Sequence, residues 1–520
     1  MLSSHSLLLA LPTELLLKIL DTVDLNALLA CQKVCRKLYG MVRDASELQH
    51  RLLLCARGLR DRLPWQDGCT PAERAVRVDE NARRWRTLTC ARSAVVAVEC
   101  RANTEVLMSA GVLAFRTGGT VTLRRLACER LGVEGKETWA VEVDVPEGWK
   151  VAGWAMDPEQ DLLAMVRSRS LDQSACLVTV VCLALSTGKR HPLADGAGVL
   201  EGRLAKDPHP DFTTSISNDH IAVLCSGLWG HEDELRVWNW KTGATELDLK
   251  AKGLDGFVFL DDAHVVVSRA HQSTNNAPLA QSAHLAIHAL RLGDSAPAPP
   301  VRLVLPAVSS LDDTNVSLRM AASAYEPDVP ETRVLALEMS LKWPSFGSAR
   351  LVRVLVDLAQ IKRFLAGPRG TDADDTNADS EVPWEDWGPD ASRVLAVEDA
   401  WSAHYVRTAV AGARCVLPLW SRGRALKTVD THPARLLAAR AAKPTAERWE
   451  IVSTASTVGI PWTNCIPATT RLAYVETEIA TPAPLDNLDL AGTEVLVGED
   501  HLVAVQRPGT GWMHVHVYDF

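Results

Sequence analysis

Residues Ser186 to Arg190 (STGKR) come nearest in this chain to a phosphate-binding loop. Such a loop needs a glycine five positions before its Gly-Lys pair, so that backbone N–H groups can surround the phosphates, and a Ser or Thr hydroxyl after the pair to bind magnesium. Here Leu183 occupies the earlier glycine position and Arg190 the hydroxyl position. The segment is therefore predicted to be a tight turn between two strands.

An acidic run, Asp372, Asp374 and Asp375, has the residue types of a calcium loop. That loop also needs a central glycine for its sharp turn and a closing bidentate glutamate. The run has no central glycine, and Pro383 stands at the closing position. The pattern favours solvated charge, so no metal site is predicted here.

Two histidine arrangements have the residue types of a metal site. His284 and His288 are four residues apart, but their segment has strand character, in which such residues lie about 13 Å apart. His514, His516 and Tyr518 would share one face of a final strand and suit a metal or a partner, although an exposed strand face is the favoured interpretation. The sequence contains no nucleophile elbow, zinc-binding HExxH helix or dinucleotide fingerprint. It therefore gives no positive support for an enzyme and implies no catalytic residue, metal or cofactor.

The composition is that of an ordinary globular protein. Of 520 residues, 47% are hydrophobic and 23% charged, which excludes wholesale disorder. No apolar run reaches the roughly 18–20 residues of a membrane helix, and Leu7 to Ala10 lacks the basic leader and cleavage site of a signal peptide. The twelve cysteines form no CxxC pair and are interpreted as reduced, mostly buried thiols. These features predict a cytoplasmic and/or nuclear protein.

Charge is distributed unevenly along the chain. Residues 1–92 carry a net charge of +5, so the remaining residues must carry −14 to give the total of −9. Such asymmetry indicates at least two units. An acidic main body argues against nucleic-acid binding as the principal activity, because contacts to phosphates dominate that affinity.

The first forty residues predict short amphipathic helices. Pro12 suits a first helical turn, Glu14 suits the positive end of a helix, and Asp24 can cap a second helix. Apolar stripes follow the helical period at Leu15, Leu16, Ile19, Leu20 and Val23, and again at Leu28, Cys31, Cys35 and Leu38. So small a unit cannot bury this much apolar surface internally, and part of it is expected to meet a partner.

This segment resembles an F-box. The matching residues are Leu11-Pro12, Glu14, Ile19-Leu20, Val23-Asp24, Leu28-Leu29 and Val34-Cys35-Arg36-Lys37, whereas Leu25 replaces a second proline of many F-boxes. The resemblance implies docking onto the Skp adaptor of a Skp–cullin–F-box (SCF) ubiquitin ligase and, through it, onto the cullin scaffold. By position, the contact or the packing behind it would involve Leu11, Pro12, Leu15, Ile19, Leu28, Leu29 and Val34. The alternative is an ordinary helical hairpin at the start of a larger domain.

After an F-box over residues 1–42, residues 43–92 are predicted to form a helical connector. Leu48, Leu52 and Cys55 recur at helical spacing. Thr70-Pro71-Ala72-Glu73 is a capping box, from which a helix runs toward Trp85. This segment resembles the connector of a group of fungal F-box proteins. It is interpreted as a stiff spacer or as helices packed on the body that follows, and both can hold.

The body, residues 93–520, changes to short apolar runs of period 2 separated by turn residues, which predicts many short antiparallel strands. Its layout repeats every 50–60 residues or so, and the turns at Thr187-Gly188 and Thr242-Gly243 are 55 residues apart. The stretch ELRVWNWKTG resembles the third strand and following turn of a WD-type blade. The prediction is a large all-β domain, a β-propeller of six to eight blades with seven favoured. A β-sandwich array is the alternative.

Segments of the body are predicted to be loops. They are a proline-rich loop at 292–300, an acidic and disordered loop at 368–381 and a smaller one at 271–278. Trp384 and Trp387 follow the acidic loop in a segment that, with GARCV at 412–416, also resembles the fungal group. Tryptophan is enriched in binding hot spots, so both are candidate target-binding residues. The alternative is that they anchor the return of the loop or cover a blade edge.

These observations favour a non-catalytic substrate-recognition subunit of an SCF ubiquitin ligase. Its F-box would bind the Skp adaptor and its propeller an unidentified protein target. One alternative is a protein-interaction scaffold that takes no part in degradation. Another is an enzyme with its pocket in the propeller channel, which rests only on analogy of fold.

Overall fold

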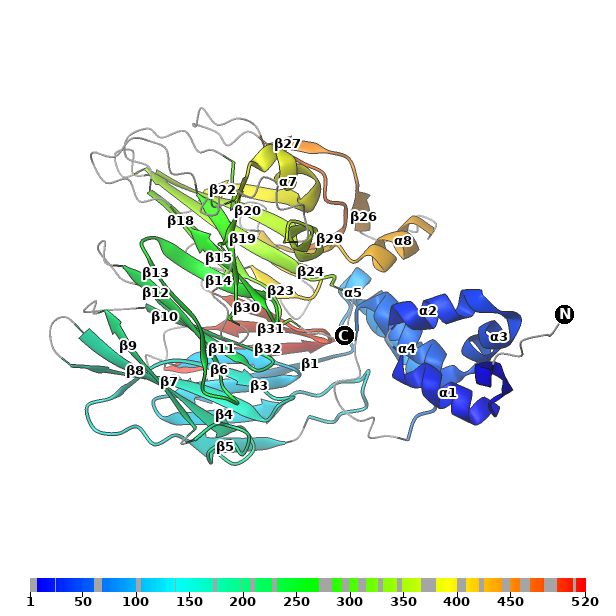
Figure 1. The fold of residues 1–520 in the computed structure, drawn as a ribbon, viewed down its shortest axis with the longest axis horizontal. Helices are drawn as coiled ribbons and strands as arrows, with labels where there is room; N and C mark the ends of the chain where they lie inside the picture. Colours follow the sequence, from blue (N-terminus) through cyan, green and yellow to red (C-terminus); the bar gives the residue numbers. More distant parts are fainter. Residues whose placement is uncertain are drawn as a thin grey trace.

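The structure is a computed structural model. It describes residues 7–23, 25–59, 68–99, 104–135, 137–171, 175–196, 198–205, 211–226, 232–270, 283–291, 299–306, 315–325, 331–343, 348–365, 380–399, 408–419, 425–441, 449–458, 468–480, 493–507 and 511–520. Asp24, the loop at 271–278 and the acidic triplet at 372–375 lie outside the described residues, as does most of the loop at 292–300. Figure 1 shows a helical head beside a larger body of strands.

The head contains a 3₁₀ turn and short helices joined by tight breaks: η1 (Leu7–Ala10), α1 (Thr13–Thr22), α2 (Leu25–Val34), α3 (Arg36–Asp44), α4 (Ser46–Arg57) and the longer α5 (Pro71–Thr87). Pro12 lies one residue before α1, in extended conformation. The second predicted stripe is divided between α2 and α3, because Cys35 is extended at the break. Gly58 ends α4 in the left-handed conformation, which glycine adopts without steric cost.

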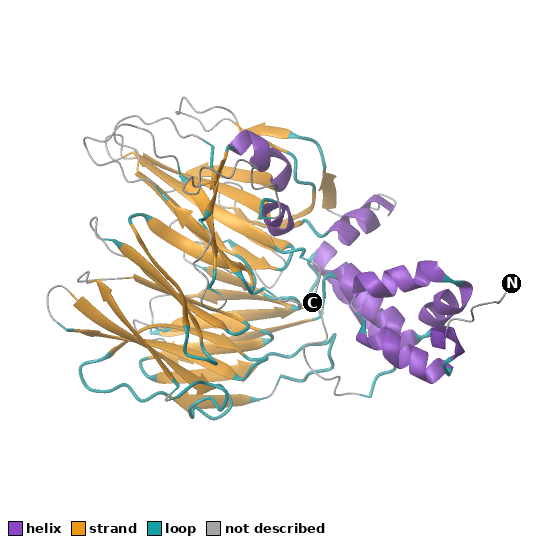
Figure 2. Cartoon of the chain, in the orientation of Figure 1, coloured by secondary structure: helices purple, strands orange, loops and turns teal. Residues whose placement is uncertain are grey.

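The body consists of sheets, whose strands are orange in Figure 2. Within each sheet the strands are mostly antiparallel and consecutive in sequence. The first three blades are β2 (Glu105–Ser109), β3 (Val112–Thr117), β4 (Thr120–Arg125) and β5 (Thr138–Glu142); β6 (Lys150–Asp157), β7 (Leu162–Ser170), β8 (Ala175–Ala184) and β9 (Val199–Ala205); and β10 (Asp211–Ser217), β11 (His220–Ser226), β12 (Asp233–Asn239) and β13 (Thr245–Ala251).

The next three blades have additional strands or helices. They are β14 (Leu254–Asp261), β15 (His264–Arg269), β16 (His284–Ala289) and β17 (Val301–Val304) with β21 (Ser380–Val382); β18 (Asn315–Ala321), β19 (Val334–Trp343), β20 (Ser348–Asp357) and β22 (Ser392–Asp399); and β23 (Ala409–Ala411), β24 (Arg414–Leu419), β25 (Ala425–Asp430) and β29 (Tyr474–Ala480) with β26 (Trp449–Val452). The accessory elements are α6 (Leu358–Arg363), α7 (Trp384–Ala391), α8 (Pro433–Ala441) and the hairpin of β27 (Ser456–Val458) and β28 (Ala468–Thr470).

The seventh blade joins distant parts of the chain. Its strands are β30 (Glu494–Val497), β31 (His501–Gln506), β32 (Trp512–Asp519) and β1 (Arg92–Glu99). Strand β1 follows the head directly and pairs antiparallel with β32, so that Arg92 lies opposite Asp519. The ring is therefore closed by a strand that precedes all the other blades.

Apolar clusters between neighbouring blades confirm the closed ring. In the described residues, seven buried clusters each bridge one pair of adjacent blades, including the pair formed by the seventh and first blades. This arrangement explains the alternating sequence pattern, because each sheet packs a face on each neighbour. The helical head and the seven-bladed β-propeller are thus confirmed, and the sandwich array is excluded.

Three further features bear on the sequence predictions. Ser380 and Glu381, the end of the segment predicted to be disordered, pair in parallel with β17 as part of β21. The described cysteines are free thiols. Among the described helices, none has both the length and the apolar character to cross a bilayer.

Candidate functional site

The helical head has a small core of its own. Leu28 is fully buried in a cluster that also contains Leu38. The Arg51 side chain on α4 donates hydrogen bonds to the carbonyl oxygens of Asp21 (2.7 Å) and Val23 (2.6 Å), which fixes α4 against the link between α1 and α2. The short helices therefore form one packed unit.

Large aliphatic side chains on α1 and α2 remain at the surface of this unit. This exposed aliphatic set is Leu15 (47% exposed), Ile19 (41%), Leu29 (41%) and Val34 (70%). Pro12 is also exposed and Leu11 is half-buried. Leaving this much apolar surface in water is unfavourable by about 25 cal/mol per Å², which favours covering it with a partner.

The seven residues predicted for adaptor contact thus divide into two groups. Leu28 packs in the core of the head, whereas the other six reach the surface. Leu8 and Tyr39 are also exposed, at 46% and 50%, and were not predicted because they lie outside the matched F-box positions. The signal for Tyr39 was a large ring next to Leu38 of the predicted stripe, whereas Leu8 lies in η1, before the first predicted helix.

Helix α5 attaches the head to the propeller. It begins at the predicted capping box, in which the Glu73 N–H donates to Thr70 Oγ1 (3.3 Å) and the Thr70 N–H donates to Glu73 Oε2 (2.8 Å). At its other end the Trp85 ring stacks on Phe520 with centroids 4.1 Å apart, and Nε1 donates to the Glu499 carbonyl (2.8 Å). The connector therefore both spaces the head and packs on the body.

A buried ion pair lies beneath this junction. Arg130, only 2% exposed, donates from Nε to Asp500 Oδ1 (2.6 Å) and from Nη2 to Oδ2 (2.9 Å). Asn81 of α5 donates to the same Oδ1 (3.0 Å) and to the Phe520 carbonyl (2.9 Å). Burial alone would raise the pKa of Asp500, but the charge and hydrogen bonds of Arg130 outweigh it and lower that pKa. The carboxylate thus links α5 to two blades.

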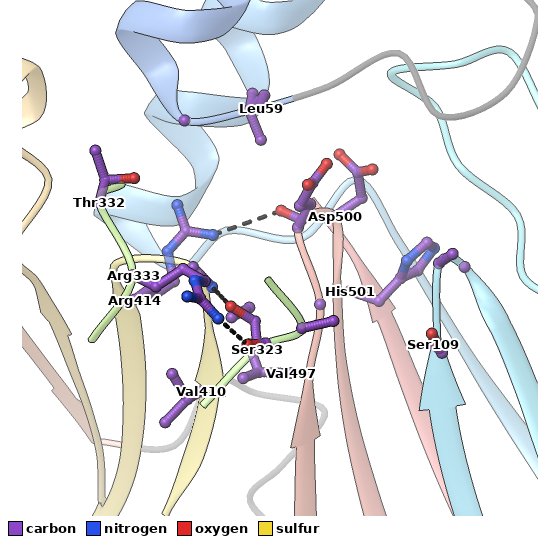
Figure 3. Close-up of a pocket in the computed structure, with 18 of the residues that line it drawn as sticks. Leu59, Ser109, Ser323, Thr332, Arg333, Val410, Arg414, Val497, Asp500 and His501 are labelled. Atoms are coloured by element: carbon purple, nitrogen blue, oxygen red, sulfur yellow. Dashed lines mark hydrogen bonds between the residues drawn. The ribbon is translucent and has the colours of Figure 1, made fainter. Parts of the chain in front are cut away.

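A cavity of about 520 Å³ lies where the head meets the propeller. The end of α4 covers it, and the turn between β2 and β3, the residues after β18 and the turns after β23 and β30 form its walls. In Figure 3, Leu59 lies above the open space, Asp500 and His501 stand on one side, and Thr332 and Arg333 stand on the other. The first strands of most successive blades contact one another. The cavity is lined by residues at the ends of four first strands, β2, β18, β23 and β30, so it lies at one mouth of the central channel.

Most charged groups that line the cavity have close partners. Arg333 donates to Glu331 Oε2 (2.8 Å) and to the Leu260 carbonyl (2.7 Å). His501 Nε2 lies 2.7 Å from the Ala127 carbonyl, and Asp500 is held by Arg130. Side chains held in this way are positioned as structural supports rather than as free acids or bases.

Arg414 differs from its neighbours in the cavity wall. It is 6% exposed, and its contacts to described polar groups are long: Nη1 lies 3.5 Å from the Glu499 carbonyl and Nε lies 3.6 Å from Asp430 Oδ2. The guanidinium also lies over the Trp85 ring, 3.9 Å from its centroid. Burial, and then repulsion from Arg435, lower the pKa of Arg414 to about 9. Its positive charge is therefore only partly compensated within the protein.

Trp384 and Trp387 lie on α7 within the core between the fourth and fifth blades. They are 7% and 1% exposed, and their rings meet edge to face at 5.0 Å. Trp387 Nε1 donates to the Val304 carbonyl (2.8 Å). This placement matches the alternative that the tryptophans anchor the chain after the acidic loop, and their part in target binding stays a prediction.

The remaining sequence candidates lie in strands or turns. Ser186 to Arg190 form a turn after β8, with Gly188 at positive φ. His284 and His288 lie in β16, and His514 and His516 lie half-buried in β32. No group of three or more potential metal ligands occurs among the residues that the structure describes.

Comparison with known proteins locates a family domain in the head. Residues 8–55 match the F-box-like family model, a span that begins in η1 and reaches α4. No curated protein matches the chain. The chain therefore combines an F-box-like domain with a seven-bladed propeller. An F-box domain implies binding to a Skp-type adaptor, and a propeller suggests a protein-binding module.

Solved structures similar to this chain include hydrazine synthase of Kuenenia stuttgartiensis, with 11% identity and a TM-score of 0.30 over 62% of this chain and 94% of that one. An uncharacterized protein from Listeria monocytogenes EGD-e has 11% identity and a TM-score of 0.33 over 79% of this chain and 92% of that one. At these scores neither likeness bears on function.

Proposed function

We propose that this chain is the substrate-recognition subunit of an SCF-type ubiquitin ligase, in which the F-box-like head binds the Skp adaptor and the propeller binds a protein target. The observation that carries the proposal is the exposed aliphatic set on the helices of the F-box-like domain. We assign adaptor contact to these four residues with Leu11 and Pro12, and assign Leu28 to the packing behind them. The complex would work in the cytoplasm and/or nucleus.

The proposed mechanism is proximity. A target held by the propeller is kept near the ubiquitin-charged enzyme that the cullin scaffold recruits, which raises the effective concentration of its lysines. The receptor itself makes and breaks no covalent bond. The docking of α5 supports this mechanism, because a fixed head and body would keep the target at a defined distance from the adaptor.

Co-purification of the full-length chain with the Skp adaptor tests the first half of the proposal. Val34→Glu places a charge in the exposed aliphatic set and should weaken adaptor binding at least tenfold, because a charge at an apolar contact is costly to desolvate. Val76→Glu on α5 is the matched control, since Val76 is 69% exposed and Val34 is 70% exposed. Equal adaptor binding by both variants would contradict the assignment of this surface.

Target degradation tests the second half. The Val34→Glu variant is used to capture proteins that bind the propeller. In cells carrying the natural chain, at least one of these proteins should accumulate with ubiquitin chains when the proteasome is inhibited. The receptor role is refuted, and the chain is a scaffold, if the natural chain binds the adaptor but proteasome inhibition changes the abundance of none of the captured proteins.

A further inference from the structure

The cavity at the channel mouth has the size and enclosure of a small-molecule site. Its volume of about 520 Å³ lies within the 300–1,000 Å³ or so typical of ligand pockets. Leu54 and Leu59 on the head and Val410 and Val497 on the propeller provide apolar walls. A ligand here would therefore be covered on one side by α4 and on the other by the blades.

The charge of the cavity lining is opposite to that of the body. Five arginines line the cavity against three carboxylates, Glu331, Glu499 and Asp500, although the body as a whole carries −14. Arg130 is matched by Asp500, Arg333 by Glu331, and Arg435 by Asp430, which lies just outside the lining. Arg51 and Arg414 remain against Glu499, which leaves a small local excess of positive charge in a partly enclosed space, where solvent screens it less than at an open surface.

Arg414 is the arginine best placed to hold an anion. The carboxylate nearest to it, Asp430, is bound more closely by Arg435 than by Arg414. Arg414 therefore stays buried with only long polar contacts to described residues, and its ring contact with Trp85 holds the guanidinium plane in place. A planar guanidinium fixed in this way can donate two parallel hydrogen bonds to a carboxylate or phosphate group.

We propose that the cavity between α4 and the channel mouth is a binding site for a small anionic molecule that carries a carboxylate or phosphate group. The anionic group contacts Arg414, and the rest of the molecule lies against Leu59 and Val410. This site is separate from the exposed aliphatic set, so ligand binding does not depend on whether the Skp adaptor binds.

Calorimetric titration of the full-length chain with citrate and, separately, with inorganic pyrophosphate tests the proposal. Saturable binding of one probe at a single site is expected, and the probe that binds more tightly distinguishes carboxylate from phosphate recognition. Arg414→Gln should weaken this binding at least tenfold. Arg236→Gln is the matched control, because Arg236 also contacts a tryptophan, Trp238, and a carboxylate, Asp248, but lies outside the cavity.

A second variant separates occupancy of the cavity from effects on folding. Thr332→Trp should occupy part of the cavity beside Arg333 while leaving its arginines in place, and should weaken binding at least tenfold with an unchanged melting temperature. The proposal is overturned if neither probe binds the natural chain saturably, or if Arg414→Gln or Thr332→Trp binds as tightly as Arg236→Gln does. Retention of probe binding by the Val34→Glu variant, which has a damaged adaptor surface, would show that the two proposals stand independently.

Discussion

Removing the Asp500 carboxylate should destabilise the chain severely, because the buried Arg130 guanidinium loses its two short hydrogen bonds to a carboxylate (2.6 and 2.9 Å). Both partners lie in the protein interior, with Arg130 at 2% and Asp500 at 6% exposure. Breaking a buried pair by removing one partner typically costs about 3–5 kcal/mol. Asp500→Ala also removes an acceptor from Asn81, which keeps its bond to the Phe520 carbonyl (2.9 Å). We therefore expect a loss of about 4 kcal/mol in the free energy of unfolding.

Removing both charges of the pair together should cost less than removing either one alone. Arg130→Met alone leaves the carboxylate unpaired and should cost a similar amount. Arg130→Met/Asp500→Leu removes both charges, and replacement of a buried pair by apolar groups is often close to neutral. The double variant should therefore lose about 2 kcal/mol or less, so that the two sites are coupled by several kcal/mol.

Urea unfolding of the full-length chain, followed by tryptophan fluorescence, measures these differences, since Trp85 lies in the same junction. Arg125→Met is the control, because Arg125 pairs with the 68%-exposed Glu137 side chain at 2.9 Å and such a pair contributes about 1 kcal/mol at most. The reasoning is refuted if Arg130→Met and Asp500→Ala each lose no more free energy of unfolding than the control does. It is also refuted if the double variant loses as much free energy of unfolding as the two single variants lose together.

Two further predictions concern the same junction. Arg435 of α8 donates from Nε to the Arg57 carbonyl at the end of α4 (2.9 Å). A Cβ at Gly58, where φ is +58°, would lie 2.8 Å from Arg435 Nη2, whereas a Cβ at Gly68, where φ is +64°, would meet no atom within 4 Å. Gly58→Ala should therefore lower the urea midpoint more than Gly68→Ala does, and equal effects would show that this contact does not confine Gly58. Burial raises the pKa of Asp519 to about 7, above its unfolded value near 3.9, so its contribution to stability is lost as pH rises through about 7. The urea midpoint of the Asp519→Asn variant, relative to that of the natural chain, should thus be higher at pH 8 than at pH 5. The same difference between the two midpoints at both pH values would contradict this.

Local signals in the sequence predicted much of the fold. The capping box at Thr70 and Glu73 located the start of α5 because all of its hydrogen bonds lie within four residues. Repeated strand and turn patterns predicted a propeller, since each blade is built largely from consecutive strands. The break at Cys35 was not predicted, because an apolar stripe can continue in register across two helices.

The sequence could not show which apolar residues stay exposed. Leu15 and Leu16 belong to one predicted stripe, yet Leu16 is 1% exposed and Leu15 is 47% exposed. Successive helical residues point about 100° apart, and only the position of the neighbouring helices decides which of them is covered. Similarly, Arg130 and Asp500 are 370 positions apart, and no local pattern indicates that two blades bring them together.

The pairing of β1 with β32 has a consequence for the order in which the protein is assembled. The head and β1 leave the ribosome before the other described strands, and domains generally begin to fold as they emerge. Strand β1 must nevertheless wait for β32, which is synthesised after every other strand described. Phe520, which holds Trp85 and Asn81, arrives later still. An F-box-like head can thus exist early in synthesis, but its rigid attachment to a closed ring requires a chain translated through β32 and Phe520.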